Sequence, residues 1–158
     1  MKRHTILFTA SVLILTIILL PVSTFALDTP GVTGAGEGTF PAGTIFATVP
    51  ISGLTFAMGI LIYTDGSAVG DFQATLAGTS VLGQPQSIEV EGTASAGVLN
   101  ADGSRTFSGS VSVDMGDGTV PLTNVSFTLT ATPTSMLLRL GITNLPSAAL
   151  TDGSITLQ

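Results

Sequence analysis

The chain has no cysteine and no tryptophan, and its only histidine and only lysine are His4 and Lys2. Beyond position 4 it therefore has no base for a Ser-His-Asp triad or a Cys-His dyad and no lysine for Schiff-base chemistry. It also has no His or Cys ligand for zinc or copper. Without cysteine, no disulfide can stabilise the fold. We expect no cofactor and no catalysis that depends on these groups.

Positive charge is scarce as well. After residue 26 the chain carries ten acidic residues, and Arg105 and Arg139 are its only basic ones, for a net charge of −8. Nucleic acids and anionic membrane surfaces attract clustered Lys and Arg, so neither is an expected partner. We expect the two arginines to pair with surface carboxylates.

The N-terminus has the three parts of a secretory signal. Lys2, Arg3 and His4 precede an apolar run over residues 6–20, and Thr24 and Ala26 supply the small residues that a signal peptidase reads. A membrane-spanning helix needs about 20 apolar residues, and this run is shorter and ends at Pro21. We therefore predict a signal peptide over residues 1–26, cleavage after Ala26, and a secreted, periplasmic or cell-surface protein that leaves the membrane.

The rest of the chain is long enough for one domain. Residues 27–43 are rich in Gly, Pro and Thr and show no period, which indicates an extended lead-in. From Thr44 the period is two: for example, Val125, Phe127 and Leu129 alternate with Ser and Thr. Such alternation is typical of strands with one buried face. Residues 44–158 are predicted to form a single all-β domain.

We expect an antiparallel β-sandwich or flattened barrel of about eight strands, with almost no helix. The expected strands lie near residues 44–49, 52–64, 71–78, 86–98, 105–114, 120–132, 136–143 and 154–158. Ile51–Tyr63 and Met136–Ile142 are apolar at nearly every position, which predicts central strands buried on both faces. Because a two-layer domain has only one interior, some of these side chains should also reach the surface.

Asp-Gly followed by Ser or Thr occurs four times and predicts turns, since Asp-Gly favours the positive φ values of a type I′ hairpin. The predicted turn-forming pairs are Asp65-Gly66, Asp102-Gly103, Asp117-Gly118 and Asp152-Gly153.

Four carboxylates are weak candidates for chemistry. Glu89 and Glu91 alternate onto one strand face, and a carboxylate pair is the basis of glycoside hydrolysis. Asp114 and Asp117 lie three residues apart near a turn, where all-oxygen ligands could hold calcium. Solvated carboxylates and a turn-forming Asp explain the same residues without catalysis or metal. We therefore assign no catalytic, cofactor or metal site.

From Gly92 onward the chain resembles small uncharacterised all-β modules of bacterial exported proteins. The resemblance rests on Gly92-Thr93-Ala94, on the strand Phe127–Ala131 and on the closing segment Leu150–Leu157. It implies a β-sandwich with an extracellular accessory role. Thr132-Pro133-Thr134-Ser135 departs from the Asp/Gly turn expected there.

The composition favours an exported, non-catalytic β domain that acts through its surface in adhesion, coat or matrix assembly, or accessory binding. Its expected partners are further copies of itself or another exported or cell-surface protein. Two alternatives remain: a small carboxylate-dependent glycan hydrolase or lyase, and a carrier of a small apolar ligand in a barrel cavity.

The signal peptide gives the first testable prediction. The protein recovered from the medium or periplasm should begin at Leu27, because Thr24 and Ala26 fit the small-residue sites of the peptidase. Intact-mass measurement checks this. Membrane-bound protein that retains residues 1–20 would contradict it.

Overall fold

The structure is a computed structural model that describes residues 29–158. The predicted signal peptide of residues 1–26, its cleavage site at Ala26, and Leu27 lie outside the described residues.

The described chain is all-β and antiparallel, as the alternation predicted, and it contains no helix. Ten strands follow one another: β1 (Gly31–Thr39), β2 (Ile45–Phe46), β3 (Val49–Ile62), β4 (Ser67–Thr79), β5 (Pro85–Leu99), β6 (Arg105–Asp114), β7 (Leu122–Ala131), β8 (Ser135–Leu140), β9 (Thr143–Asn144) and β10 (Ala148–Leu157).

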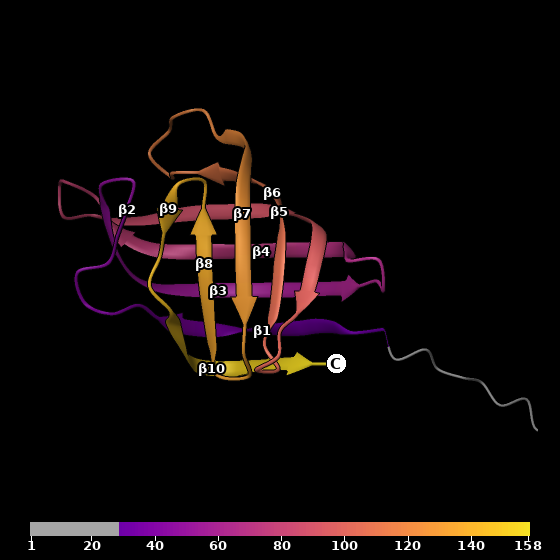
Figure 1. The fold of residues 1–158 in the computed structure, drawn as a ribbon. Coiled ribbons are helices and arrows are strands. Elements are labelled where there is room, and N and C mark those ends of the chain that lie inside the picture. The colour runs from indigo at the N-terminus through magenta and orange to yellow at the C-terminus, as the bar shows by residue number, and fades with distance from the viewer. Residues whose placement is uncertain (1–28) are drawn as a thin grey trace, which may run out of the picture.

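The strands form one sheet that returns on itself. The hydrogen-bonded order is β1-β10-β8-β7-β6-β5-β4-β3-β2, and β1 also pairs with β3 along its whole length. This second pairing joins the two sides of the path into a ring-like sheet (Figure 1). The β10–β8 pairing is the shortest link in the ring, with only Ala148 and Ala149 opposite β8.

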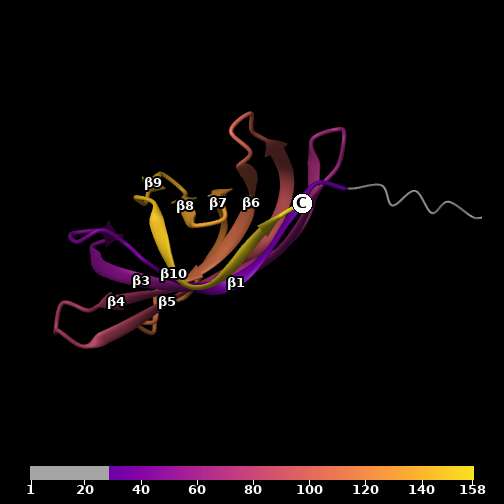
Figure 2. The same cartoon turned by 90° about the horizontal axis from the view of Figure 1, so that it is seen from below.

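The ring is flattened into two layers that cross each other. β1, β3, β4 and the first half of β5 form one layer, and β7 and β8 run across it in the other (Figures 1 and 2). β5 and β6 bend and contribute to both layers, and the register between them shifts at Ala94/Ala96. Such a bend with a register shift is how strands turn a corner between crossed layers.

The interior of the ring is one apolar core. Phe72 of β4 and Phe127 of β7 stack across it with their ring centroids 5.7 Å apart. Phe72 and Phe107 have no exposed surface. Aromatic side chains of this size need matching space, and glycines on the inward face supply it: Gly92 and Gly109 lie at the corner of β5 and β6, where a Cβ would overlap the backbone of the neighbouring strand.

Burial on both faces of Ile51–Tyr63 and Met136–Ile142 was a wrong expectation. In β3 the side chains of Phe56, Met58 and Ile60 are buried, and those between them face solvent. β8 alternates in the same way. Because the ring encloses one interior, every strand has one inward face only, and apolar residues at the other positions are exposed.

The expected lead-in over residues 27–43 contains a complete strand, β1, which the sequence did not predict. Its inward positions after Val32 are Gly34, Gly36 and Gly38, so no apolar alternation is visible in the sequence. These glycines let β1 pack closely between two partners: a Cβ on Gly34 or Gly36 would meet a carbonyl oxygen of β10.

The first two Asp-Gly turns form the predicted hairpins, but of another type. In the β3–β4 turn, Gly66 N–H donates to Tyr63 O (2.9 Å) and Tyr63 N–H to Ser67 O (2.8 Å). Gly66 and Gly103 have positive φ, whereas no described Asp does. This is a three-residue loop with a glycine bulge and not a type I′ turn. The β5–β6 turn at Asp102-Gly103 repeats the pattern.

The other two Asp-Gly pairs differ. Asp117-Gly118 lies in the longer loop that connects β6 to its antiparallel neighbour β7. Asp152-Gly153 is not a turn, because both residues lie inside β10, next to a register shift against β1. Gly153 has φ +85° and packs against Ala35 and Gly36, so the pair adapts β10 to the glycine-rich strand β1.

The role of the inward glycines can be tested with two matched substitutions. Gly109→Ala should lower the free energy of unfolding by about 1–3 kcal/mol, because the new methyl group overlaps the Thr93 carbonyl. Gly59→Ala, on the outward face of β3 with open space around it, should be neutral or stabilising by about 0.5–1 kcal/mol. Denaturant titration measures both. Equal effects would contradict the proposed packing.

Candidate functional site

Glu89 and Glu91 lie on the outer face of β5, exposed to solvent, as their alternation predicted. Glu89 stands opposite Thr75, whose hydroxyl donates to it at 3.4 Å, and Glu91 stands opposite Gln73. The surrounding depression is shallow and open, at about 180 Å³. The two carboxylates are neighbours along one strand. Glycoside hydrolysis requires two carboxylates that face each other across a cleft, and these two do not.

Asp114 and Asp117 are engaged in local turns. Asp114 Oδ1 accepts a hydrogen bond from Gly116 N–H (2.8 Å), and Asp117 Oδ1 accepts from the Thr119 N–H (2.9 Å) and hydroxyl (2.6 Å). No three carboxylates of residues 29–158 gather closely enough to hold a metal ion.

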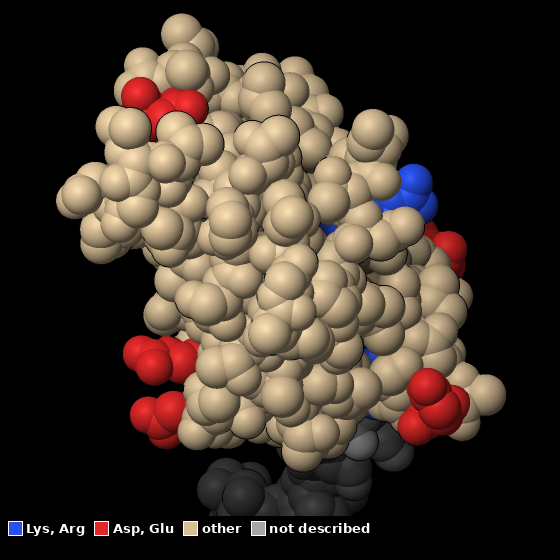
Figure 3. Space-filling model, turned by 90° about the vertical axis from the view of Figure 1, so that its left-hand side faces the viewer, with Lys and Arg blue, Asp and Glu red and all other residues tan. Residues whose placement is uncertain are grey.

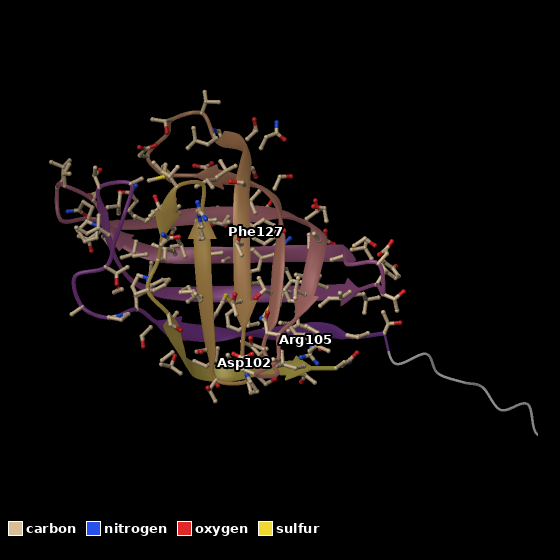
Figure 4. The ribbon with its side chains drawn as sticks, viewed as in Figure 1. Asp102, Arg105 and Phe127 are labelled. Atoms are coloured by element: carbon tan, nitrogen blue, oxygen red, sulfur yellow. The ribbon has the colours of Figure 1, made fainter. Side chains whose placement is uncertain are left out.

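Three turn aspartates share one electrostatic environment. Asp65, Asp102 and Asp117 each accept two hydrogen bonds from the Ser or Thr two positions later. The bond from its hydroxyl has the larger effect and the bond from its backbone N–H the smaller, and together they hold each carboxyl pKa below its ordinary value of 3.8. The bonds favour the charged form because a carboxylate is the better acceptor. These aspartates therefore stabilise turns, and Figure 4 shows Asp102 at the turn that joins β5 to β6.

The two arginines do not pair with carboxylates within the described residues, so that expectation was wrong. Arg105 is buried at the start of β6 and donates to Gly103 O (2.6 Å) and Gln158 O (2.7 Å). Its Nε is buried and has no hydrogen-bond partner in the described chain. Arg105 thus links the β5–β6 turn to the end of β10 (Figure 4). Arg139 donates to Gly141 O (3.1 Å).

Several exposed aliphatic side chains lie in loops at one end of the ring. Hairpin loops of an antiparallel ring alternate between its two ends, so the β2–β3, β4–β5, β6–β7 and β8–β9 connections share an end. Val81, Leu82, Val120 and Ile142 lie in these loops and are 94, 83, 87 and 94% exposed. Ile45 and Leu122, in the strands that adjoin these loops, are also exposed. We call this set the aliphatic rim: Ile45, Val81, Leu82, Val120, Leu122 and Ile142.

The side of the molecule that carries β2 and the β4–β5 loop has little charge. Figure 3 looks onto this side, and its centre is mostly uncharged, with acidic side chains and a basic side chain toward its margins. The sequence predicted exposed apolar side chains only within Ile51–Tyr63 and Met136–Ile142, and of the aliphatic rim only Ile142 lies in those segments. The sequence signal that could have revealed these exposed side chains is an aliphatic residue next to a turn-forming Gly or Pro, as in Val81-Leu82-Gly83.

Comparison with known proteins adds no relative: no protein-family model, curated protein or solved structure matches the chain. Residues 29–158 contain no helix with the length and hydropathy needed to span a bilayer.

The turn aspartates give a prediction on pH. Because their folded pKa values are lowered, they contribute stability above the ordinary value of 3.8, and this contribution is lost as pH falls through the lowered values. Ser67→Ala removes the hydroxyl that contributes most at Asp65, so the pKa of Asp65 should rise toward 3.8 in an NMR titration. Asp102 in the same spectra is the control. An unchanged pKa of Asp65 would contradict the assignment.

Proposed function

We propose that this chain is an exported, non-catalytic domain that acts by contact, binding further copies of itself or another exported protein through the aliphatic rim. The observation that carries the proposal is the rim itself. Four of its side chains are more than four-fifths exposed at one end of a ring whose core already has abundant apolar residues. Apolar surface that gathers on one side of a soluble domain typically marks an interaction site.

The charge distribution supports the same proposal. The side that carries β2 and the β4–β5 loop has little charge at its centre (Figure 3), so few ionic groups would lose hydration on contact. Secretion, and the extracellular accessory role implied by the resemblance of residues 92–158 to exported all-β modules, fit a domain of this kind.

Contact accounts for the described residues better than the two alternatives. The carboxylates Glu89 and Glu91 share an open strand face without a cleft between them. The inside of the ring is filled by side chains such as Phe72, Phe107 and Leu129, which have no exposed surface, so the aliphatic side chains available for binding are on the outside.

Light scattering on the exported protein tests the proposal. The wild-type protein should have a mass above that of a monomer at micromolar concentration, and the double variant Val81→Ser/Leu82→Ser should shift toward the monomer. Removing a buried aliphatic side chain from a contact costs about 1.5–3 kcal/mol, which weakens association by roughly tenfold or more per side chain.

The matched control is Val69→Ser, which removes an aliphatic side chain that is half exposed on β4 and is not part of the rim. This variant should associate like the wild type. If the control and the rim variant weaken association equally, the rim is not the contact surface. A strictly monomeric wild type that also captures no exported protein would overturn the proposed function.

A further inference from the structure

The opposite end of the ring carries an apolar groove of about 350 Å³. The groove is lined by Pro30, Ile62, Tyr63, Thr64, Gly66, Gly97, Val98 and Leu99. The side chains of Tyr63, Val98 and Leu99 are about half exposed, so the groove is accessible from solvent. We call it the Tyr63 groove.

The chain enters the described fold along the wall of this groove. Ile62 N–H donates to Pro30 O (2.7 Å), and Gly31 exchanges two backbone hydrogen bonds with Gln158 (3.0 and 3.3 Å). These bonds fix Pro30 as part of the wall. Thr29 precedes a proline, which restricts its backbone to extended conformations. Any residue just before Thr29 is therefore connected to the fold at this wall.

We propose that the Tyr63 groove binds the side chain of Leu27, the N-terminal residue after signal cleavage. This inference rests on cleavage after Ala26, which leaves only Leu27 and Asp28 before the described residues. Leu27 is three residues from Pro30, so its Cα can lie up to about 10 Å away. The aliphatic leucine side chain matches the apolar walls, and the short connection lets it reach them.

Charge supports the same occupant. Cleavage creates an α-ammonium group on Leu27 in a protein that has only two other positive side chains. The Asp65 carboxylate stands on the turn whose Gly66 lines the groove. An ammonium group beside this carboxylate would be attracted to it, whereas the uncleaved chain has no charge at that position.

The short connection also favours Leu27 over an external ligand. A side chain tethered by so few residues has a high effective concentration at a groove that it can reach, so it fills the groove before a dilute partner does.

Tyr63 makes the inference directly measurable, because it is the only tyrosine and the chain has no tryptophan. Near-ultraviolet-excited fluorescence of the protein therefore comes from the groove. The full chain is expressed with its signal, and the exported protein is purified and checked by intact mass. Acrylamide quenching then measures how accessible Tyr63 is in the wild type and in Leu27→Ser, Leu27→Ile and Ile142→Ser.

Leu27→Ser should lose the protection of Tyr63, so that its quenching constant rises toward that of free N-acetyltyrosinamide. It should also lower the melting temperature by roughly 2–4 °C. Leu27→Ile keeps an aliphatic side chain and should keep the protection, and Ile142→Ser, in the aliphatic rim, should not affect Tyr63. In a double-mutant cycle, Val98→Ser should be less destabilising in the Leu27→Ser background than in the wild type.

Equal quenching of Tyr63 in wild type and Leu27→Ser, with both proteins shown by mass to begin at residue 27, would overturn the inference. A mass that places the N-terminus elsewhere would overturn it as well. Light scattering separates this inference from the proposed function. If Leu27→Ser and wild type show equal Tyr63 quenching while Val81→Ser/Leu82→Ser loses association, the groove inference fails and the proposed function stands.

Discussion

The structure depends on closing one antiparallel sheet around a single apolar core. Closure requires that β1 pair on both sides, with β10 and with β3, along its whole length. It also requires that the sheet turn corners tightly enough to bring Phe72 and Phe127 into contact across the interior. Glycine meets both requirements, because it lets neighbouring backbones approach where a Cβ would collide.

Closure also determines where side chains can act. A ring-like sheet has one inward face, so apolar residues in excess of the core must lie outside or at the ends. At one end the β3–β4 and β5–β6 turns are built on Asp-Gly pairs whose carboxylates accept hydrogen bonds from neighbouring hydroxyls. At the other end the loops carry Val81, Leu82, Val120 and Ile142 into solvent. The two ends therefore offer different surfaces for contact.

The buried Arg105 connects the end of β10 to β6, away from the short pairing between β10 and β8. β10 pairs with β8 over only two residues, so little of the β10 edge is held by the opposite layer. Arg105 reaches from the start of β6 to Gln158 O, just after β10, and so ties that end of β10 to β6. A guanidinium suits this position because its planar donors can bond two carbonyl oxygens at once.

Alternation of apolar and polar residues was sufficient to predict the all-β class and most strands, since burial on one face produces that pattern directly. β1 was missed because glycine has no side chain with which to alternate. Asp152-Gly153 was predicted as a turn because local preference alone cannot reveal that its positive φ is used in a bulge against β1. The aliphatic rim and the environment of Arg105 arise from residues distant in sequence, which a single sequence does not place together.

Native-state hydrogen exchange measured by NMR tests the central claim most directly. If β1 closes the ring, its amides donate alternately to β10 and β3, and residues 31–39 should exchange as slowly as the central residues of β3. If residues 31–39 exchange as fast as an unprotected peptide while β3 and β4 stay protected, the ring is not closed and the account is wrong.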